Sequence, residues 1–211
     1  RNLEVAKSIL DEEKDDEADS IESQSKWKRL GDLALHYGDI SLAKSCAEKA
    51  DDLSGLMLLH SSSGNKEGMK ALGERARSFG RNNVAFLAYF VSGHVEECID
   101  LLVDTNRLPE AAFFARTYFP SRISSILHLW KKDLSKINEK AAEALADPEK
   151  YANLFPDLEI ALQIEKMFVA NRDQFVPASK YLEAKKELDL NLIDLVKAQQ
   201  NAGTDNTSPS A

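Results

Sequence analysis

The sequence contains few of the residues that form turns in β-proteins. Its 211 residues include only 9 glycines and 6 prolines, and no stretch alternates apolar and polar side chains as a half-buried strand does. It also contains no apolar run of about 18 residues that could cross a membrane, and no signal peptide. These absences argue against a β-sandwich and favour an all-α protein that contacts membranes only through its partners.

Basic charge is also scarce. The net charge is −8, and residues 1–25 alone contain nine acidic and three basic residues. The remaining chain is therefore nearly neutral and has no broad basic field for phosphate groups. We expect no nucleic-acid binding.

Residue patterns that carry chemistry are missing as well. Cys46 and Cys98 lie far apart, outside any CxxC motif, which favours buried thiols in a reducing compartment over a disulfide framework. No phosphate-binding, dinucleotide-binding, zinc-protease or serine-hydrolase motif is present. None of the four histidines has a metal-ligand partner at helical spacing, so we expect surface or capping roles for His36, His60, His94 and His128. The sequence predicts a protein that is not an enzyme and has no cofactor or metal.

Helical periodicity runs through most of the chain. Apolar residues recur at i, i+3 and i+4, beginning with Trp27, Leu30 and Ala34. Pro109 is placed as in the first turn of a helix. The predicted helices cover residues 3–10, 26–37, 40–50, 53–59, 69–79, 84–91, 95–102, 109–119, 123–130, 137–146, 158–169 and 181–196, with a short segment at 151–155.

A fixed register follows four of the breaks between these helices, those at Gly38, Gly64, Gly93 and Asn106. The residues five and eight positions after each break are apolar in all four cases. The breaks are 26, 29 and 13 residues apart, so one step of about 13 residues corresponds to one helix and two steps to a helical hairpin. Such hairpins bury their apolar faces by stacking. The sequence therefore predicts an all-α fold, an α-solenoid of tetratricopeptide-like helical hairpins.

This pattern divides the chain into five parts. Residues 1–10 form the end of a preceding helical repeat, which suggests a piece of a longer chain. Residues 11–25 form an acidic mobile loop, and residues 26–155 form the solenoid repeats. Residues 156–200 form C-terminal helices that continue or cap the solenoid, and residues 201–211 form a disordered tail.

Two clusters are candidates for the core or for a partner surface. The aromatic pairs Phe113-Phe114 and Tyr118-Phe119 are more typical of a core than of an interface. In the predicted helix at 123–130 and just after it, an apolar Leu-Trp pair is followed by two cations. We expect an exposed partner-binding strip there, formed by Leu129, Trp130, Lys131 and Lys132.

Several blocks of the sequence resemble the β′ (beta-prime) subunits of coatomer, the COPI vesicle coat. The longest block is residues 107–121, RLPEAAFFARTYFPS. The others are WKRLGDLA at 27–34, NNVAF at 82–86, LWK at 129–131, LSKINEKAAE at 134–143, ALADP at 144–148 and NLF at 153–155. The resemblance covers about residues 3–155, with weaker support to residue 200, and the acidic stretch at 11–19 is not part of it.

The resemblance implies the C-terminal α-solenoid segment of such a subunit. In that family two WD-repeat propellers precede this segment and read dilysine signals on cargo, while the solenoid joins the coatomer alpha subunit in the outer layer of the coat. It implies a cytoplasmic protein, peripheral on Golgi membranes and COPI-coated vesicles, that serves Golgi-to-ER and intra-Golgi transport with other coatomer subunits. It implies no catalytic residue.

One alternative from a different functional class remains open, a peptide-binding tetratricopeptide-like adaptor domain. Such a domain would need Lys, Arg or Asn side chains that converge along a groove. The registers five and eight positions after each break are apolar instead.

Overall fold

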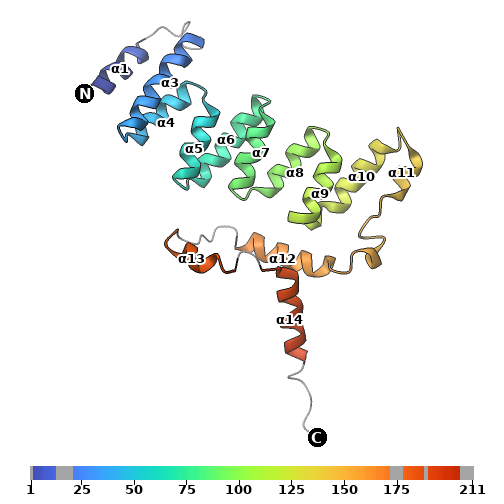
Figure 1. Ribbon diagram of the computed structural model, residues 1–211. Coiled ribbons are helices and arrows are strands. Elements are labelled where there is room, and N and C mark those ends of the chain that lie inside the picture. The colour runs from blue at the N-terminus through green and yellow to red at the C-terminus, as the bar shows by residue number, and fades with distance from the viewer. Residues whose placement is uncertain (1, 13–20, 172–177, 188–189, 205–211) are drawn as a thin grey trace. The chain divides into compact units, whose positions relative to one another are not determined.

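The computed structural model describes residues 2–12, 21–171, 178–187 and 190–204. Every regular element within these ranges is a helix, which confirms the all-α fold (Figure 1). Contacts between residues divide the chain into two compact units, unit 1 at residues 1–101 and unit 2 at residues 102–211. The boundary between them falls inside one helix.

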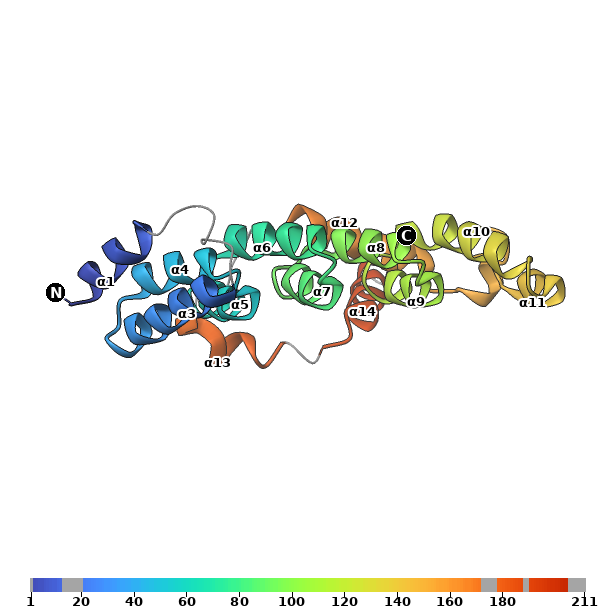
Figure 2. The ribbon, with the colours of Figure 1, turned by 90° about the horizontal axis from the view of Figure 1, so that it is seen from above.

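Unit 1 is a stack of antiparallel helices in two layers. Its helices are α1 (Asn2–Asp11), α3 (Ile21–His36), α4 (Ile40–Lys49), α5 (Leu53–Ser62), α6 (Lys66–Ser78), α7 (Asn82–Val91) and most of α8 (Val95–Asp104). Within this unit α3, α5 and α7 form one layer and α4 and α6 form the other (Figure 2). From α1 to α7 each of these helices contacts the next, and α5 also contacts α7. This is the predicted solenoid arrangement of stacked hairpins.

Short connections enforce this stacking. Six residues with positive φ stand between consecutive helices at intervals of 13, 13, 16, 13 and 13 residues, namely Gly38, Asp51, Gly64, Gly80, Gly93 and Asn106. The sequence analysis used four of them as breaks. It ended one helix at residue 50 and began the next at residue 53, but did not count Asp51 among the register breaks, because a residue other than glycine seldom adopts this conformation.

The residue after each positive-φ position ends one helix and begins the next. The Asp39 amide donates to the Ala34 carbonyl at 2.8 Å, which completes a Schellman motif. The Asp39 carboxylate then accepts from the Leu42 amide at 2.9 Å and caps α4. Asp52 and Asn65 cap α5 and α6 in the same way. Because the connection is this short, the next helix must fold back and pack against the previous one.

The start of α3 corrects the predicted acidic loop. Residues 21–25 are helical, and Ser23 is only 2% exposed. Ser23, Trp27 and Leu30 lie on one buried stripe of α3, so the helix extends one turn and a half beyond the apolar pattern. The apolar pattern does not reveal this turn, because its buried residue is a serine. Residues 13–20 lie outside the described ranges.

Helix α1 packs against α3 through Leu3, Ala6 and Leu10. Lys49 of α4 adds polar links at this end of unit 1, because it pairs with Asp11 and lies 4.4 Å from the centre of the Trp27 ring. The predicted first helix thus packs against the core of unit 1 with partly buried side chains.

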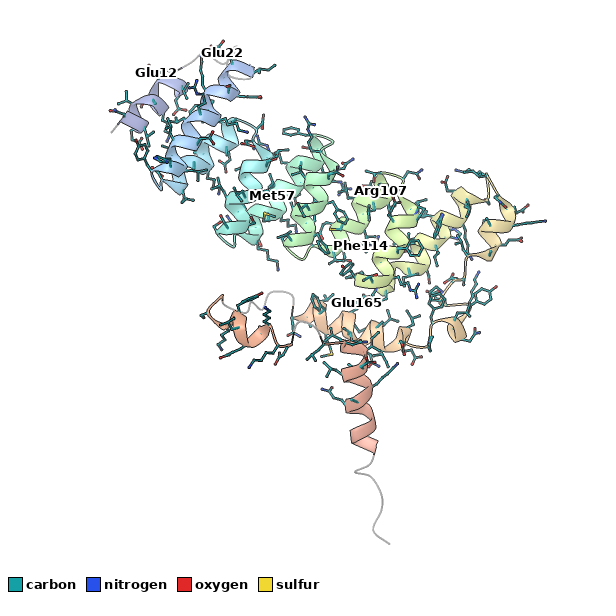
Figure 3. All side chains as sticks on the ribbon, viewed as in Figure 1. Glu12, Glu22, Met57, Arg107, Phe114 and Glu165 are labelled. Atoms are coloured by element: carbon teal, nitrogen blue, oxygen red, sulfur yellow. The ribbon has the colours of Figure 1, made fainter. Side chains whose placement is uncertain are left out.

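Unit 2 contains shorter and less regular elements. They are α9 (Leu108–Tyr118), η1 (Pro120–Arg122), α10 (Ile123–Leu134), α11 (Glu139–Ala144), η2 (Ala152–Leu154), α12 (Leu158–Ala170), η3 (Ala178–Lys180), α13 (Tyr181–Ala184) and α14 (Leu192–Thr204). Helices α9 and α10 form a hairpin, and α12 packs on η1 and α14. Glu165 of α12, labelled in Figure 3, accepts a hydrogen bond from the Ser121 amide at 2.8 Å.

Two predictions for the C-terminal part were wrong. The single helix expected at 181–196 is two helices, because the Asn191 side chain accepts from the Ile193 amide at 3.1 Å and starts a new helix, α14. Helix α14 continues to Thr204, so residues 201–204, which were expected to belong to the disordered tail, are helical. Residues 205–211 lie outside the described part of the chain. The capping role expected for residues 156–200 stays a prediction.

Candidate protein-interaction surfaces

The repeated register forms the core. Counted from each of the six positive-φ residues, the side chains at positions five and eight are Ala43, Cys46, Leu56, Leu59, Met69, Leu72, Ala85, Ala88, Cys98, Leu101, Ala111 and Phe114. All of these are buried except Phe114, which is partly buried. Ligand recognition must therefore come from other positions on the helices.

Both cysteines are buried, as predicted. Burial, with a smaller contribution from the neighbouring Glu97 carboxylate, raises the pKa of the Cys98 thiol to about 12. Burial also raises the pKa of Cys46, against the opposing influence of Lys7 and Lys49. Such thiols stay protonated at neutral pH and are poor nucleophiles.

Two of the four histidines are buried, which corrects the expectation of a surface role for them, although His94 follows Gly93 and stands at the capping position before α8. His36 and His128 are exposed, but His60 and His94 are only 6% and 4% exposed. Burial lowers the pKa of His60, and the Lys44 ammonium lowers it further. The imidazole of His60 packs on the backbone of Gly68 in the next helix. This histidine is a packing element of the core at neutral pH.

Within the described ranges, no group of three His, Cys, Asp or Glu side chains could hold a metal ion. Among the same residues, no helix is both long and apolar enough to span a membrane.

The aromatic cluster at 113–119 is largely on the surface, which corrects its assignment to the core. Phe113 is 61% and Tyr118 48% exposed. Phe114 packs on Tyr118 with ring centroids 4.7 Å apart. The α-helical period turns Phe113 outwards while Ala111, Ala112 and Ala115 face inwards.

The strip predicted at 129–132 is spread around α10. Four consecutive residues cover about 300° of a helix, so they cannot all face one direction. Leu129 is 42% exposed and Lys132 is exposed. Trp130 is partly buried and meets Phe113 edge-on, with ring centroids 6.1 Å apart. The structure thus pairs Trp130 with α9 and leaves the partner-binding role of Leu129, Trp130, Lys131 and Lys132 a prediction.

A second surface was missed by the sequence analysis. Neither α5 nor α7 contains an aspartate, glutamate, lysine or arginine, although both helices have exposed residues. Leu58 of α5 is 65% exposed, and Leu87 and Val91 of α7 are 44% and 59% exposed. The signal was present in the sequence as two helices of ten residues without charge, but only the layered structure shows that their outer sides lie in one layer.

Comparison with known proteins identifies the repeat. The family model described as the COPA/B TPR domain matches residues 2–131. The chain is 48% identical over 198 residues to coatomer subunit beta'-1 of Oryza sativa subsp. japonica. The aligned region covers 94% of the chain and 21% of that protein. It is 47% identical over 199 residues to coatomer subunit beta'-3 of Arabidopsis thaliana, with 94% of the chain and 21% of the relative covered.

The similarity extends to animals. Coatomer subunit beta' of Mus musculus is 44% identical over 179 residues, which covers 85% of the chain and 20% of that protein. The chain spans about a fifth of the length of these curated relatives. The resemblance of the sequence blocks to coatomer β′ subunits is thereby confirmed, and the chain belongs to the COPA/B TPR domain family.

Proposed function

We propose that this chain is a structural segment of a COPI coatomer β′ subunit and acts as a protein–protein interaction scaffold. Its proposed partner is the solenoid of the coatomer alpha subunit, within a complex that contains the other coatomer subunits. The match of the COPA/B TPR family model to residues 2–131, which include the whole stacked core of unit 1, carries this proposal.

The proposed setting is the cytoplasmic face of Golgi membranes and COPI-coated vesicles, in Golgi-to-ER and intra-Golgi transport. In this role the chain binds membranes only indirectly, through the assembled coat, and performs no catalysis. The buried and protonated state of both thiols is consistent with a purely architectural part.

The peptide-adaptor alternative finds little support in the register. Positions five and eight after each connection are filled by buried apolar side chains, so a peptide groove would have to be built from other residues.

Mixing the chain with the solenoid segment of a coatomer alpha subunit on a sizing column tests the proposal. At about micromolar concentrations, a complex with a dissociation constant below that range co-elutes as a new, earlier peak. A tetratricopeptide protein of similar size and charge, mixed with the alpha subunit in the same way, controls for non-specific association. Separate elution of the chain and the alpha segment would reject the pairing.

A further inference from the structure

The hairpin of α9 and α10 has a positive charge, unlike the chain as a whole. From Arg107, the N-cap of α9, to Ser135, the C-cap of α10, the sequence contains five basic and two acidic residues and has a net charge of +3. The whole chain has a net charge of −8, so the residues outside the hairpin carry −11. The hairpin is therefore a basic region of an acidic protein.

Both acidic residues of the hairpin already have basic partners. Glu110 pairs with Arg107 at 3.3 Å, and Asp133 pairs with Lys136 at 3.1 Å. These carboxylates are therefore not available to the other basic side chains of α9 and α10, and the hairpin keeps an excess of positive charge.

Two carboxylates from elsewhere in unit 2 reach the hairpin near its turn. Glu165 accepts a hydrogen bond from the Ser121 amide, and Asp147 accepts one from the Ser124 hydroxyl, both at 2.8 Å. Phe113 lies in the middle of α9, away from this turn. The acidic groups of unit 2 that bind the hairpin thus do so at its turn.

An aromatic pair bridges the two helices of the hairpin. Helices α9 and α10 lie side by side (Figure 1), and the rings of Phe113 and Trp130 meet edge-on across them. Phe113 is nevertheless 61% exposed. Arg116 is exposed too, and it is a neighbour of Phe113 on the surface of α9 because it follows three residues later. We call Phe113, Arg116 and Trp130 the aromatic-basic surface.

We propose that the aromatic-basic surface binds an acidic segment of a different protein, and that this segment also presents an apolar side chain. The inference rests on the proposed pairing with the alpha solenoid and names the surface used and the chemistry of the partner. The apolar side chain packs on the exposed ring of Phe113. A carboxylate pairs with the guanidinium of Arg116, whose planar fork of donors matches it. Tryptophan and arginine are among the residues that contribute most to binding at protein interfaces.

The charge and the packing of the hairpin argue against two other occupants. A two-fold contact between copies of the chain places the same surface on both sides, and here it would oppose two regions of net charge +3. A helix that lies in an anionic lipid surface presents a whole apolar face to it, whereas α9 and α10 bury their apolar faces in the core. An acidic segment of a different protein fits both the charge and the two rings.

The test removes the ring and the charge of this surface separately. Titration calorimetry measures binding to the coatomer alpha solenoid for the wild type, Phe113→Ala and Arg116→Glu. The matched controls are Phe79→Ala and Arg81→Glu, which change an exposed phenylalanine and an exposed arginine of unit 1 in the same way. Because all four side chains are exposed, thermal unfolding should change little.

Each surface variant should weaken binding at least about tenfold, as the loss of a central interface residue does. The two controls should bind like the wild type. The affinity of the wild type should fall between about 0.1 and 0.5 M NaCl, because salt screens the attraction between opposite charges. Arg116→Glu should lose most of this salt dependence.

Several outcomes would overturn the inference. Surface variants that bind like the wild type would reject the site and leave the proposed pairing intact, and controls that weaken binding as much would show that the effect is not specific to this surface. An affinity that salt leaves unchanged, or tighter binding by Arg116→Glu, would show that the partner segment is not acidic.

Two further measurements distinguish other occupants. Sedimentation that revealed a dimer of the chain, lost in the surface variants, would assign the surface to a second copy. Co-sedimentation with phosphatidylserine vesicles, lost in the same variants, would assign it to a membrane. Failure of the wild type to bind the alpha solenoid would reject the proposed pairing, and with it this site.

Discussion

Two glycines inside helices set how closely neighbouring helices approach. A Cβ at Gly73 would lie 2.5 Å from the ring of the buried Tyr89, and a Cβ at Gly68 would overlap the ring of His60. The absence of a side chain at these positions lets an aromatic or imidazole ring lie flat on the next backbone. In an isolated helix glycine costs about 1 kcal/mol relative to alanine, so close packing has to offset that cost.

Gly73→Ala should therefore lower the free energy of unfolding despite its better helix propensity. Overpacking a core costs about 1–3 kcal/mol, and the gain in propensity returns about 1 kcal/mol of it. Urea denaturation followed by circular dichroism measures the difference. In a Tyr89→Leu background the same substitution should cost less, and an equal cost in both backgrounds would show that the ring is not the obstacle.

His60 should make stability depend on pH. Its pKa in the folded chain is lowered below 6.5, so below that pH the unfolded chain binds more protons than the folded chain. The free energy of unfolding contributed by His60 is complete above pH 6.5 and is lost as the pH falls below it.

Unfolding free energies measured from about pH 7.5 to 5.5, above the range where most carboxylates titrate, should fall more steeply for the wild type than for His60→Gln. The comparison of slopes cancels the contribution of other histidines and any general loss of stability in the variant. Equal slopes would mean that His60 titrates alike in both states.

At the scale of the elements, the short connections between consecutive helices determine how the helices are arranged. Each connection in the repeated part places one residue at positive φ and puts the next residue at the start of the following helix, where its carbonyl accepts the first hydrogen bond of that helix. At Gly80 nothing lies within 4 Å of the position that a Cβ would occupy, so a substitution there meets only backbone strain.

Gly80→Ala should destabilise the chain by about 1–2 kcal/mol, the cost of a left-handed conformation for an ordinary residue. Asn106, which already adopts φ +57° without being glycine, offers the opposite change. Asn106→Gly should shift stability by less than about 0.5 kcal/mol, since asparagine tolerates this region. Thermal unfolding of both variants checks the pair, and a large loss for Asn106→Gly would contradict the backbone explanation.

On the scale of the whole molecule, the core is unevenly shared between the two units. Most buried apolar side chains of the described residues belong to unit 1, and α12 and α13 in unit 2 have no buried residue. Regions with few buried contacts open at lower free energy. We therefore expect unit 2 to be the less stable of the two.

The two tryptophans allow a direct measurement, because Trp27 lies in unit 1 and Trp130 in unit 2. Trp130→Phe leaves fluorescence that reports on unit 1, and Trp27→Phe leaves fluorescence that reports on unit 2. The urea midpoint seen by Trp130 should be lower than that seen by Trp27. Coincident midpoints would indicate a single cooperative transition across both units.

The sequence alone was sufficient for the helical repeat. Helix period, glycine breaks and apolar registers are local properties, and they predicted the core positions at Cys46, Leu72 and Cys98 as well as the family. Local patterns failed where a polar residue takes a structural place. Ser23 is buried in α3, Asp51 adopts positive φ, and Asn191 starts a helix.

Which surfaces remain exposed was decided only by the tertiary structure. Phe113 and Leu58 are large apolar residues of the kind usually found in a core. Only the packing of neighbouring helices shows that they lie on the surface while alanines fill the interior. Hydrophobicity in a sequence says that a side chain avoids water, but not whether its cover comes from the same chain or from another. The stacking of α5 beside α7 shows this for unit 1, because it covers one side of each helix and leaves Leu58, Leu87 and Val91 exposed.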